Sequence, residues 1–168
     1  MQKRIKLFFA LYLLVVIKVI IFKYPFDQLF EIARTWSPDV IADGFKTANF
    51  VPFRTIKMYI EYAYKLNSFE NIAGNILVFM PFGILFPMLD RKRRKAWNVL
   101  LNAFLLVLGI EIFQLCSAFG AFDVDDILLN CFGAWFGYII YCISDKISHV
   151  IAWKKVGGEK YGTYFEKN

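Results

Sequence analysis

GIEIFQLCSAFGAFDVDDILLNCFGAWFG, residues Gly109 to Gly137, is the stretch that decides the fold of this chain. It joins two apolar runs through a short acidic loop, and the runs carry a glutamate, a glutamine, aspartates and an asparagine. Ionisable groups at membrane depth are costly, so they usually face a protein interior or a water-filled cavity, and a functional site is their default interpretation. The stretch therefore predicts both a helical membrane protein and the place of its site.

The composition of the whole chain agrees with this. It has 168 residues, of which 58% are hydrophobic and 19% aromatic, and its mean hydropathy is +0.47. A soluble domain is less apolar. The net charge of +6 alone would suggest nucleic acid, but the basic residues gather at the ends of apolar runs, as membrane flanks do. We therefore expect no nucleic-acid partner, and we interpret Cys116, Cys131 and Cys142 as small packing residues.

Four apolar runs predict four transmembrane helices in a single domain, residues 1–168. The predicted spans are about 5–22, 72–89, 97–118 and 127–143, and the last could extend as a helix towards Trp153. Lys3 and Arg4 precede the first run, as in a signal peptide. That run is too long for a signal peptide and no small-x-small cleavage site follows it, so we interpret it as a retained anchor.

Lysine and arginine in the short loops predict the orientation. They occur at the N-terminus, in the loop 90–95 and in the tail 144–168, whereas the loop 119–126 has neither and carries three aspartates. Both termini and the basic loop are therefore expected inside, with the acidic loop outside. The prediction is an all-α, multi-pass protein of the cell membrane with N-in/C-in topology, whose tail is cytoplasmic and whose site faces the extracytoplasmic side.

Residues 23–70, between the first two spans, have balanced charge and are predicted to form an outer cap lying on the membrane. Residues 28–36 and 55–64 have amphipathic patterns typical of short interfacial helices. Turn signals lie between them, at Ser37-Pro38-Asp39 and Ala42-Asp43-Gly44.

Polar side chains of three predicted spans converge near the outer leaflet. At ~1.5 Å per helical residue, Glu111 lies roughly 21 Å above Trp97, and the i, i+3 spacing puts Gln114 on the same face. The second span starts at the same level, and so does the fourth. The predicted binding residues are Asn71, Asn75, Glu111, Gln114, Asp123, Asp125, Asp126 and Asn130.

Structural interpretations compete with this site. The amides could be interhelical hydrogen-bond partners, and Gly133–Gly137 is typical of a small-xxx-small packing face. Asp123 and Asp125 could be solvated loop charges, with Asp125 a helix N-cap. The Glu111 carboxylate needs a proton, a partner or a cation. Its nearest candidate counter-ion is Arg54 from the cap, and sharing a cation with Asp126 is the other option.

Pro81 predicts a kink in the second span, and Pro87 its inner end. Motifs for nucleophilic catalysis, metal binding or nucleotide binding do not occur, so we expect no cofactor and no metal. Paired carboxylates such as Glu111 and Asp126 could still act as acid and base.

Several short motifs occur in a fixed order and spacing: NFVPF at 49–53, NIAGNILVFMPFG at 71–83, IEIFQ at 110–114, FDVDDILLN at 122–130, and then Gly133 and Gly137. With these motifs the chain resembles the VanZ-like family of bacterial membrane proteins. The resemblance implies a link to low-level resistance to teicoplanin, a lipoglycopeptide, without the altered wall precursors that defeat vancomycin, and it implies no settled reaction. The loop 117–122 departs from the family, because many members carry an arginine there.

Two functions follow as hypotheses. The first is a non-enzymatic envelope protein of Gram-positive bacteria whose outer-leaflet polar pocket binds an amphiphile. Its partner would be a membrane lipid, a lipid-linked wall precursor or a lipoglycopeptide antibiotic. The alternative is an intramembrane enzyme acting on a lipid-linked substrate, with Glu111 and Asp126 as acid/base pair or metal ligands. A transporter is a weaker option, because four short spans leave little room for a path.

Overall fold

The computed structural model describes residues 2–21, 25–62 and 68–165. The all-α prediction is confirmed, because the β pairing within these residues is limited to an isolated bridge between Asn49 and Asp123. In chain order the elements are α1 (Gln2–Val16), the π-helix η1 (Ile17–Ile21), α2 (Phe26–Arg34), α3 (Asp39–Thr47), α4 (Arg54–Glu61), α5 (Ser68–Leu89), the 3-10 turn η2 (Arg91–Arg93), α6 (Ala96–Ser117) and α7 (Val124–Phe165).

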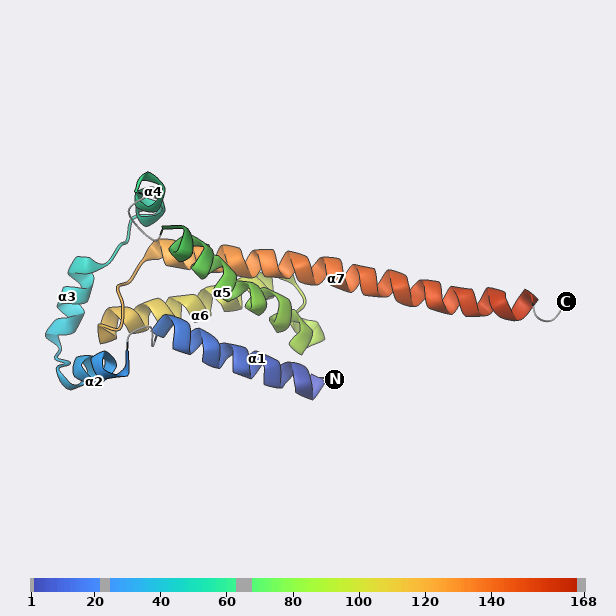
Figure 1. Cartoon of the computed structure of the whole chain (residues 1–168), viewed down its shortest axis with the longest axis horizontal. Coiled ribbons are helices and arrows are strands. Elements are labelled where there is room, and N and C mark those ends of the chain that lie inside the picture. The colour runs from blue at the N-terminus through green and yellow to red at the C-terminus, as the bar shows by residue number, and fades with distance from the viewer. Residues whose placement is uncertain (1, 22–24, 63–67, 166–168) are drawn as a thin grey trace.

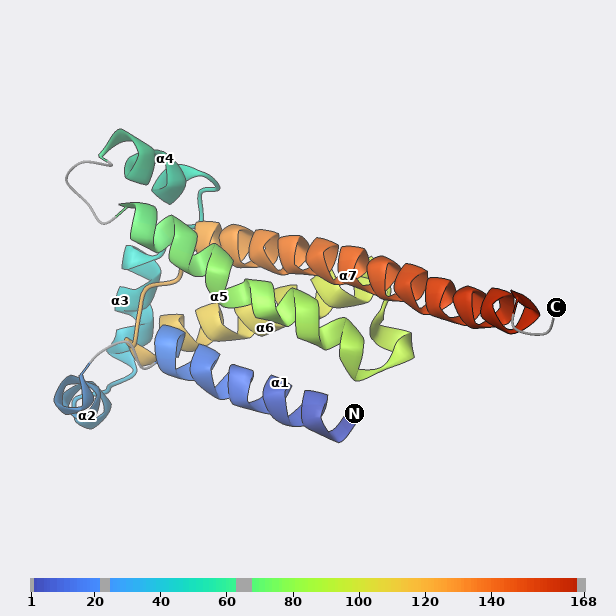
Figure 2. The ribbon, with the colours of Figure 1, turned by 45° about the vertical axis from the view of Figure 1, so that its right-hand side comes forward.

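Helices α1, α5, α6 and α7 lie side by side as a bundle, and α2, α3 and α4 lie across one end of it (Figures 1 and 2). We call these three short helices and their connections, residues 25–62, the cap. Both chain termini and the turn between α5 and α6 lie at the other end (Figure 1). The acidic loop and the basic loop are therefore at opposite ends of the bundle, as the positive-inside pattern requires.

Three helices are long and apolar enough to cross a membrane: Phe69–Leu89, Ala96–Ser117 and Val124–Trp153. They coincide with the second, third and fourth predicted spans. The first predicted span falls on α1 and η1, of which α1 has 15 residues. A fourth crossing and the sidedness of the protein stay predictions. Helix α7 continues to Phe165, far beyond the predicted end at residue 143, and protrudes from the bundle (Figure 1).

Glycines let α5 and α7 lie very close together. A Cβ atom added to Gly133 would lie 2.1 Å from the carbonyl oxygen of Ile76, and one added to Gly137 would lie 2.0 Å from that of Met80. Any larger residue would push the two backbones apart. The small-xxx-small packing face predicted for the fourth span is confirmed.

Aromatic side chains join α1 to α5. The Phe9 ring lies 5.7 Å from that of Phe82, and the Tyr12 hydroxyl donates to the carbonyl oxygen of Val78 at 2.9 Å. Helix α5 runs through both of its prolines and ends at Leu89, where the predicted second span also ends, two residues after Pro87. Buried helices tolerate proline where neighbouring groups pack against the freed carbonyls.

Helix α3 is the main correction within the cap. The predicted turn at Ala42-Asp43-Gly44 is wrong, because these residues lie inside a helix. A Cβ atom on Gly44 would lie 2.5 Å from the carbonyl oxygen of Leu115. Glycine costs a helix about 1 kcal/mol relative to alanine, and here it allows α3 to cross the backbone of α6. Helices α2 and α4 confirm that short helices form near residues 28–36 and 55–62. Residues 63 and 64 of the second prediction lie outside the described residues, and the place of both helices at the membrane interface stays a prediction.

Candidate functional site

Asp125 fixes the cap to the bundle. Its side chain is fully buried, and its carboxylate accepts hydrogen bonds from the backbone N–H groups of Phe53 at 2.5 Å, Thr55 at 2.7 Å and Ile56 at 3.1 Å. These are the donors at the start of α4, where an anion is stabilised by unpaired amides and by the helix dipole. The interpretation of Asp125 as a solvated charge or as the N-cap of its own helix is wrong.

Asp123 caps α7 instead. Its carboxylate accepts from the backbone N–H of Asp125 at 2.8 Å, from Asn49 Nδ2 at 2.8 Å and from the Thr55 hydroxyl at 2.5 Å. The backbones also pair, since the N–H of Asn49 donates to Phe122 and that of Val124 to Asn49. Asp123 is therefore not a solvated loop charge either. It joins the acidic loop to the segment that leads into α4.

Glu111 of α6 binds the acidic loop between α6 and α7. It is 2% exposed, and its carboxylate accepts a hydrogen bond from the backbone N–H of Asp123 at 2.9 Å. The predicted counter-ion, Arg54, lies on the wall of a cavity beside Asp123 and Asp126, and Glu111 does not line that cavity. The carboxylate in the apolar part of α6 thus positions the loop between α6 and α7.

Three helices and the cap enclose a polar cavity of about 270 Å³. Asn75 and Asp126 meet in its wall, where Asn75 Nδ2 donates to Asp126 Oδ1 at 2.7 Å. The predicted convergence of α5, α6 and α7 is therefore present in the structure. The lining residues are Val19, Tyr59, Glu70, Asn71, Gly74, Asn75, Val78, Gln114 and Asp126.

A second polar cavity, of about 350 Å³, shares Tyr59 and Asp126 with the first. We call the two together the cap cleft. The second cavity brings Lys46 and Arg54 of the cap beside Asp123 and Asp126. Burial, and then the carboxylates of Asp126 and Asp123, raise the pKa of the Tyr59 phenol. Tyr59 is therefore a neutral hydrogen-bonding group at the junction of the two cavities.

An apolar cavity of about 440 Å³ lies near the same end of the bundle, against the loop that follows α6. Phe119 of that loop faces α2 across it, and the other lining residues are Lys18, Phe26, Leu29, Phe30 and Ala33. The neighbouring loop residues Ala118 and Gly120 line a further small cavity that also reaches Gln114. Polar and apolar cavities therefore lie next to one another around the loop between α6 and α7.

The structure divides the eight predicted binding residues into two groups. Asn71, Asn75, Gln114, Asp123 and Asp126 line the cap cleft. Glu111, Asp125 and Asn130 do not line it, and the Asn130 amide donates to the backbone oxygen of Asp126 at 2.7 Å. Sequence reasoning missed the cavity positions of Tyr59 and Thr55, and it named Arg54 as a counter-ion of Glu111, whereas Arg54 lines the cavity beside Asp123 and Asp126. The NFVPF motif just before α4 was the available signal, because its Asn49 binds the acidic loop.

Metal binding receives no support from side-chain clustering: within the described residues, no group of three or more His, Cys, Asp or Glu side chains could hold a metal ion.

Comparison with known proteins gives the family. The sequence model of the VanZ/LLP1 family matches residues 9–145. Protein VanZ of Enterococcus faecium is 28% identical to the chain over 139 residues, which are 82% of this chain and 73% of that protein. No solved structure matches the chain. The chain belongs to the VanZ/LLP1 family, and the resemblance found in its motifs is confirmed.

Proposed function

We propose that this member of the VanZ/LLP1 family is a non-enzymatic protein of the bacterial cell envelope that binds an amphiphile in its cap cleft. The amphiphile is a membrane lipid, a lipid-linked wall precursor or the lipid-bearing face of a lipoglycopeptide. Binding at the extracytoplasmic surface reduces susceptibility to teicoplanin. Vancomycin, which carries no lipid chain, is affected less.

The observation that carries the proposal is the position of Asp126. It lies in the first turn of α7, accepts a hydrogen bond from Asn75 of α5, and lines both cavities of the cap cleft. A carboxylate fixed by a neighbouring amide and faced by a neutral phenol is typical of a preformed polar site. The same cleft has Arg54 on its other wall, so groups of both signs are available to a ligand.

The chemistry around the cleft suits a ligand with a polar and an apolar part. Val19 and Val78 form apolar walls within the first cavity, and the phenylalanine-lined cavity lies near the same end of the bundle. The headgroup of such a ligand would contact the polar wall of the cap cleft, and its acyl chain would pack against the apolar surfaces. Arg54 also supplies a cation that the loop 117–122 does not carry.

The alternative, an intramembrane enzyme, needs Glu111 and Asp126 to act on one substrate. Glu111 is buried and accepts the Asp123 amide, and it lines neither cavity of the cap cleft. A general acid or base must come within hydrogen-bond reach of the substrate. The geometry therefore favours binding, with Asp126 and Asn75 as the groups that contact the ligand.

Susceptibility in a Gram-positive host tests the role. Wild type, Asp126→Asn and Asp145→Asn would be expressed at equal membrane levels, with teicoplanin and vancomycin titrated side by side. Asparagine at 126 keeps an oxygen for Asn75 and removes the charge. Asp145 lies in α7 beyond the cleft, where its carboxylate is 3.7 Å from Nε2 of His149. We expect wild type and Asp145→Asn to raise the teicoplanin threshold equally and Asp126→Asn to raise it little.

Equal protection by all three proteins would refute the cleft as the site, and no protection by wild type would refute the role in teicoplanin susceptibility. Calorimetric titration of teicoplanin into the purified protein in detergent separates direct antibiotic binding from an indirect effect. Direct binding should weaken in Asp126→Asn and stay unchanged in Asp145→Asn.

A further inference from the structure

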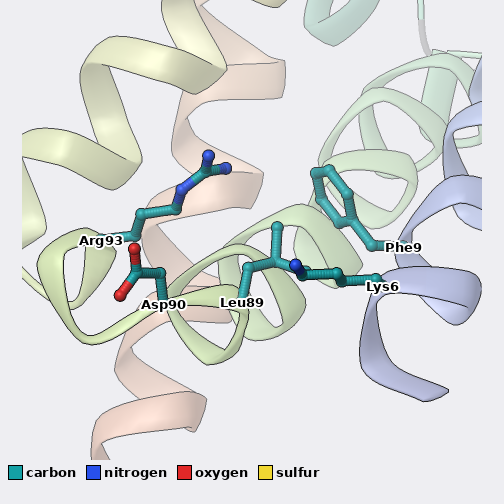
Figure 3. Close-up of a pocket in the computed structure, with 5 residues that line it drawn as sticks. All are labelled: Lys6, Phe9, Leu89, Asp90 and Arg93. Carbon is teal, nitrogen blue, oxygen red and sulfur yellow. The ribbon is translucent and has the colours of Figure 1, made fainter. Parts of the chain in front are cut away.

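A separate cavity lies at the opposite end of the bundle, between the start of α1 and the turn after α5. It has a volume of about 300 Å³ and is lined by Lys6, Phe9, Leu89, Asp90 and Arg93. Figure 3 shows Lys6 coming from α1 and Arg93 from η2, on opposite sides of Leu89, with the Phe9 ring beside them. Two cations thus line one space whose other lining residues are the apolar Phe9 and Leu89 and the carboxylate of Asp90. We call this the basic-end pocket.

The Arg93 side chain is held in place. Its guanidinium lies over the Phe86 ring, 5.0 Å from the ring centroid, and Phe86 stacks on Phe82 at 4.9 Å. Phe86 also lies 6.0 Å from Phe9 in the pocket wall. A cation over an aromatic ring gains about 0.5–1 kcal/mol at an exposed site. The cation is therefore positioned by the same aromatic cluster that joins α1 to α5.

The carboxylate of the pocket is turned towards its own loop. Asp90 Oδ1 accepts a hydrogen bond from the backbone N–H of Lys92 at 3.3 Å. Neither Lys6 nor Arg93 forms an ion pair with Asp90 in the part of the chain that the structure describes. The pocket has two positive groups and one negative group, so it carries a net positive charge.

We propose that the basic-end pocket binds the phosphate headgroup of an anionic phospholipid, with the first part of the acyl chain against Phe9 and Leu89. Arg93 and Lys6 donate to the phosphate oxygens, and the apolar wall continues along α1 and α5. Basic pockets between membrane helices take anionic headgroups in this way. Trp97, 70% exposed at the start of α6, is a residue type enriched at the membrane–water interface. The site is distinct from the cap cleft and does not depend on its proposed function.

Lipid titration of the full chain in non-ionic detergent tests the proposal, with bound lipid counted by native mass spectrometry. The probes are phosphatidylglycerol, phosphatidylcholine and soluble glycerol phosphate. The variant Lys6→Gln/Arg93→Gln removes both cations. The matched control Lys3→Gln/Arg94→Gln also removes one lysine of α1 and one arginine of the loop, but neither residue lines the pocket.

We expect phosphatidylglycerol to bind more tightly than phosphatidylcholine, whose choline cation opposes Lys6 and Arg93. Each pocket cation should contribute about fivefold in affinity, so the double variant should bind phosphatidylglycerol about 25-fold more weakly. The control should change affinity less than about twofold, because a charge outside the pocket makes no direct contact with the bound lipid.

Asp90→Asn makes the test independent of misfolding. It removes the one negative charge and keeps an oxygen for the Lys92 amide, so it should bind phosphatidylglycerol about fivefold more tightly. Three results would overturn the proposal: unchanged binding by Lys6→Gln/Arg93→Gln, equal weakening by the control, or no gain with Asp90→Asn. Displacement of the lipid by equimolar glycerol phosphate would assign the pocket to a soluble phosphate and overturn the lipid as its ligand.

Discussion

Replacing Asp125 with alanine should release the cap from the bundle. The change removes the acceptor for three backbone N–H groups at the start of α4, those of Phe53, Thr55 and Ile56. Hydrogen bonds to a charged group contribute about 1.5–3 kcal/mol each. The three bonds are only partly buried, so we take the lower value. Three such bonds give a loss of about 4.5 kcal/mol.

Amide hydrogen exchange on the full chain in lipid nanodiscs measures this loss directly. A change of about 4.5 kcal/mol in the free energy of local opening corresponds to about two-thousandfold faster exchange. The faster exchange should be confined to residues 49–61 of the cap. Residues 99–110 of α6, which form much of the core, should exchange as in wild type.

The matched control is Asp43→Ala, also in the cap. Asp43 forms an exposed pair with Lys46 at 2.8 Å, and water and salt screen such a pair, so it contributes little to stability. It should leave exchange in residues 49–61 nearly unchanged. If Asp125→Ala exchanges no faster than Asp43→Ala there, the buried carboxylate does not hold the cap and the reasoning is wrong.

Three further predictions concern packing, the loop and pH. Gly137→Ala should destabilise the protein by about 1–3 kcal/mol, because its Cβ would meet the Met80 carbonyl. Its control, Gly109→Ala, has nothing within 4 Å of its Cβ and should stabilise the protein by about 0.5–1 kcal/mol. Equal melting temperatures of the two variants would contradict this prediction. Glu111→Ala should speed amide exchange in residues 122–126, because the Asp123 N–H loses its acceptor at a cost of about 1–3 kcal/mol. Glu111→Gln keeps an oxygen that can accept this hydrogen bond, so it should change the exchange less. Equal effects of the two variants would refute the role of this hydrogen bond. The raised pKa of Tyr59 means that the folded state favours the neutral phenol. The contribution of Tyr59 to stability is therefore complete below about pH 10. It is lost as the pH rises through the raised pKa. Unfolding measured against pH should therefore show wild type losing more stability than Tyr59→Phe above about pH 10, and parallel curves would contradict the shift.

The sequence by itself determined the helices of the bundle and the level at which their polar side chains converge. Hydrophobic length and the positions of lysine and arginine are local properties of the chain, so they predict spans without knowledge of tertiary contacts. The place of the cleft followed from spacing along three helices, because Asn75, Gln114 and Asp126 lie at similar heights. The order of the motifs predicted the family before any comparison.

Only the tertiary structure decided which polar groups face the cleft. Glu111 and Asp125 have the same charge as Asp126, yet they bind backbone amides of the loop and of α4 and leave Asp126 in the cavity wall. Helix α3 was missed for a related reason, because Gly44 is a turn signal along the chain but a close contact with α6 in space. Hydrogen bonds between segments about 70 residues apart depend on how the cap docks, and local sequence patterns carry no record of that docking.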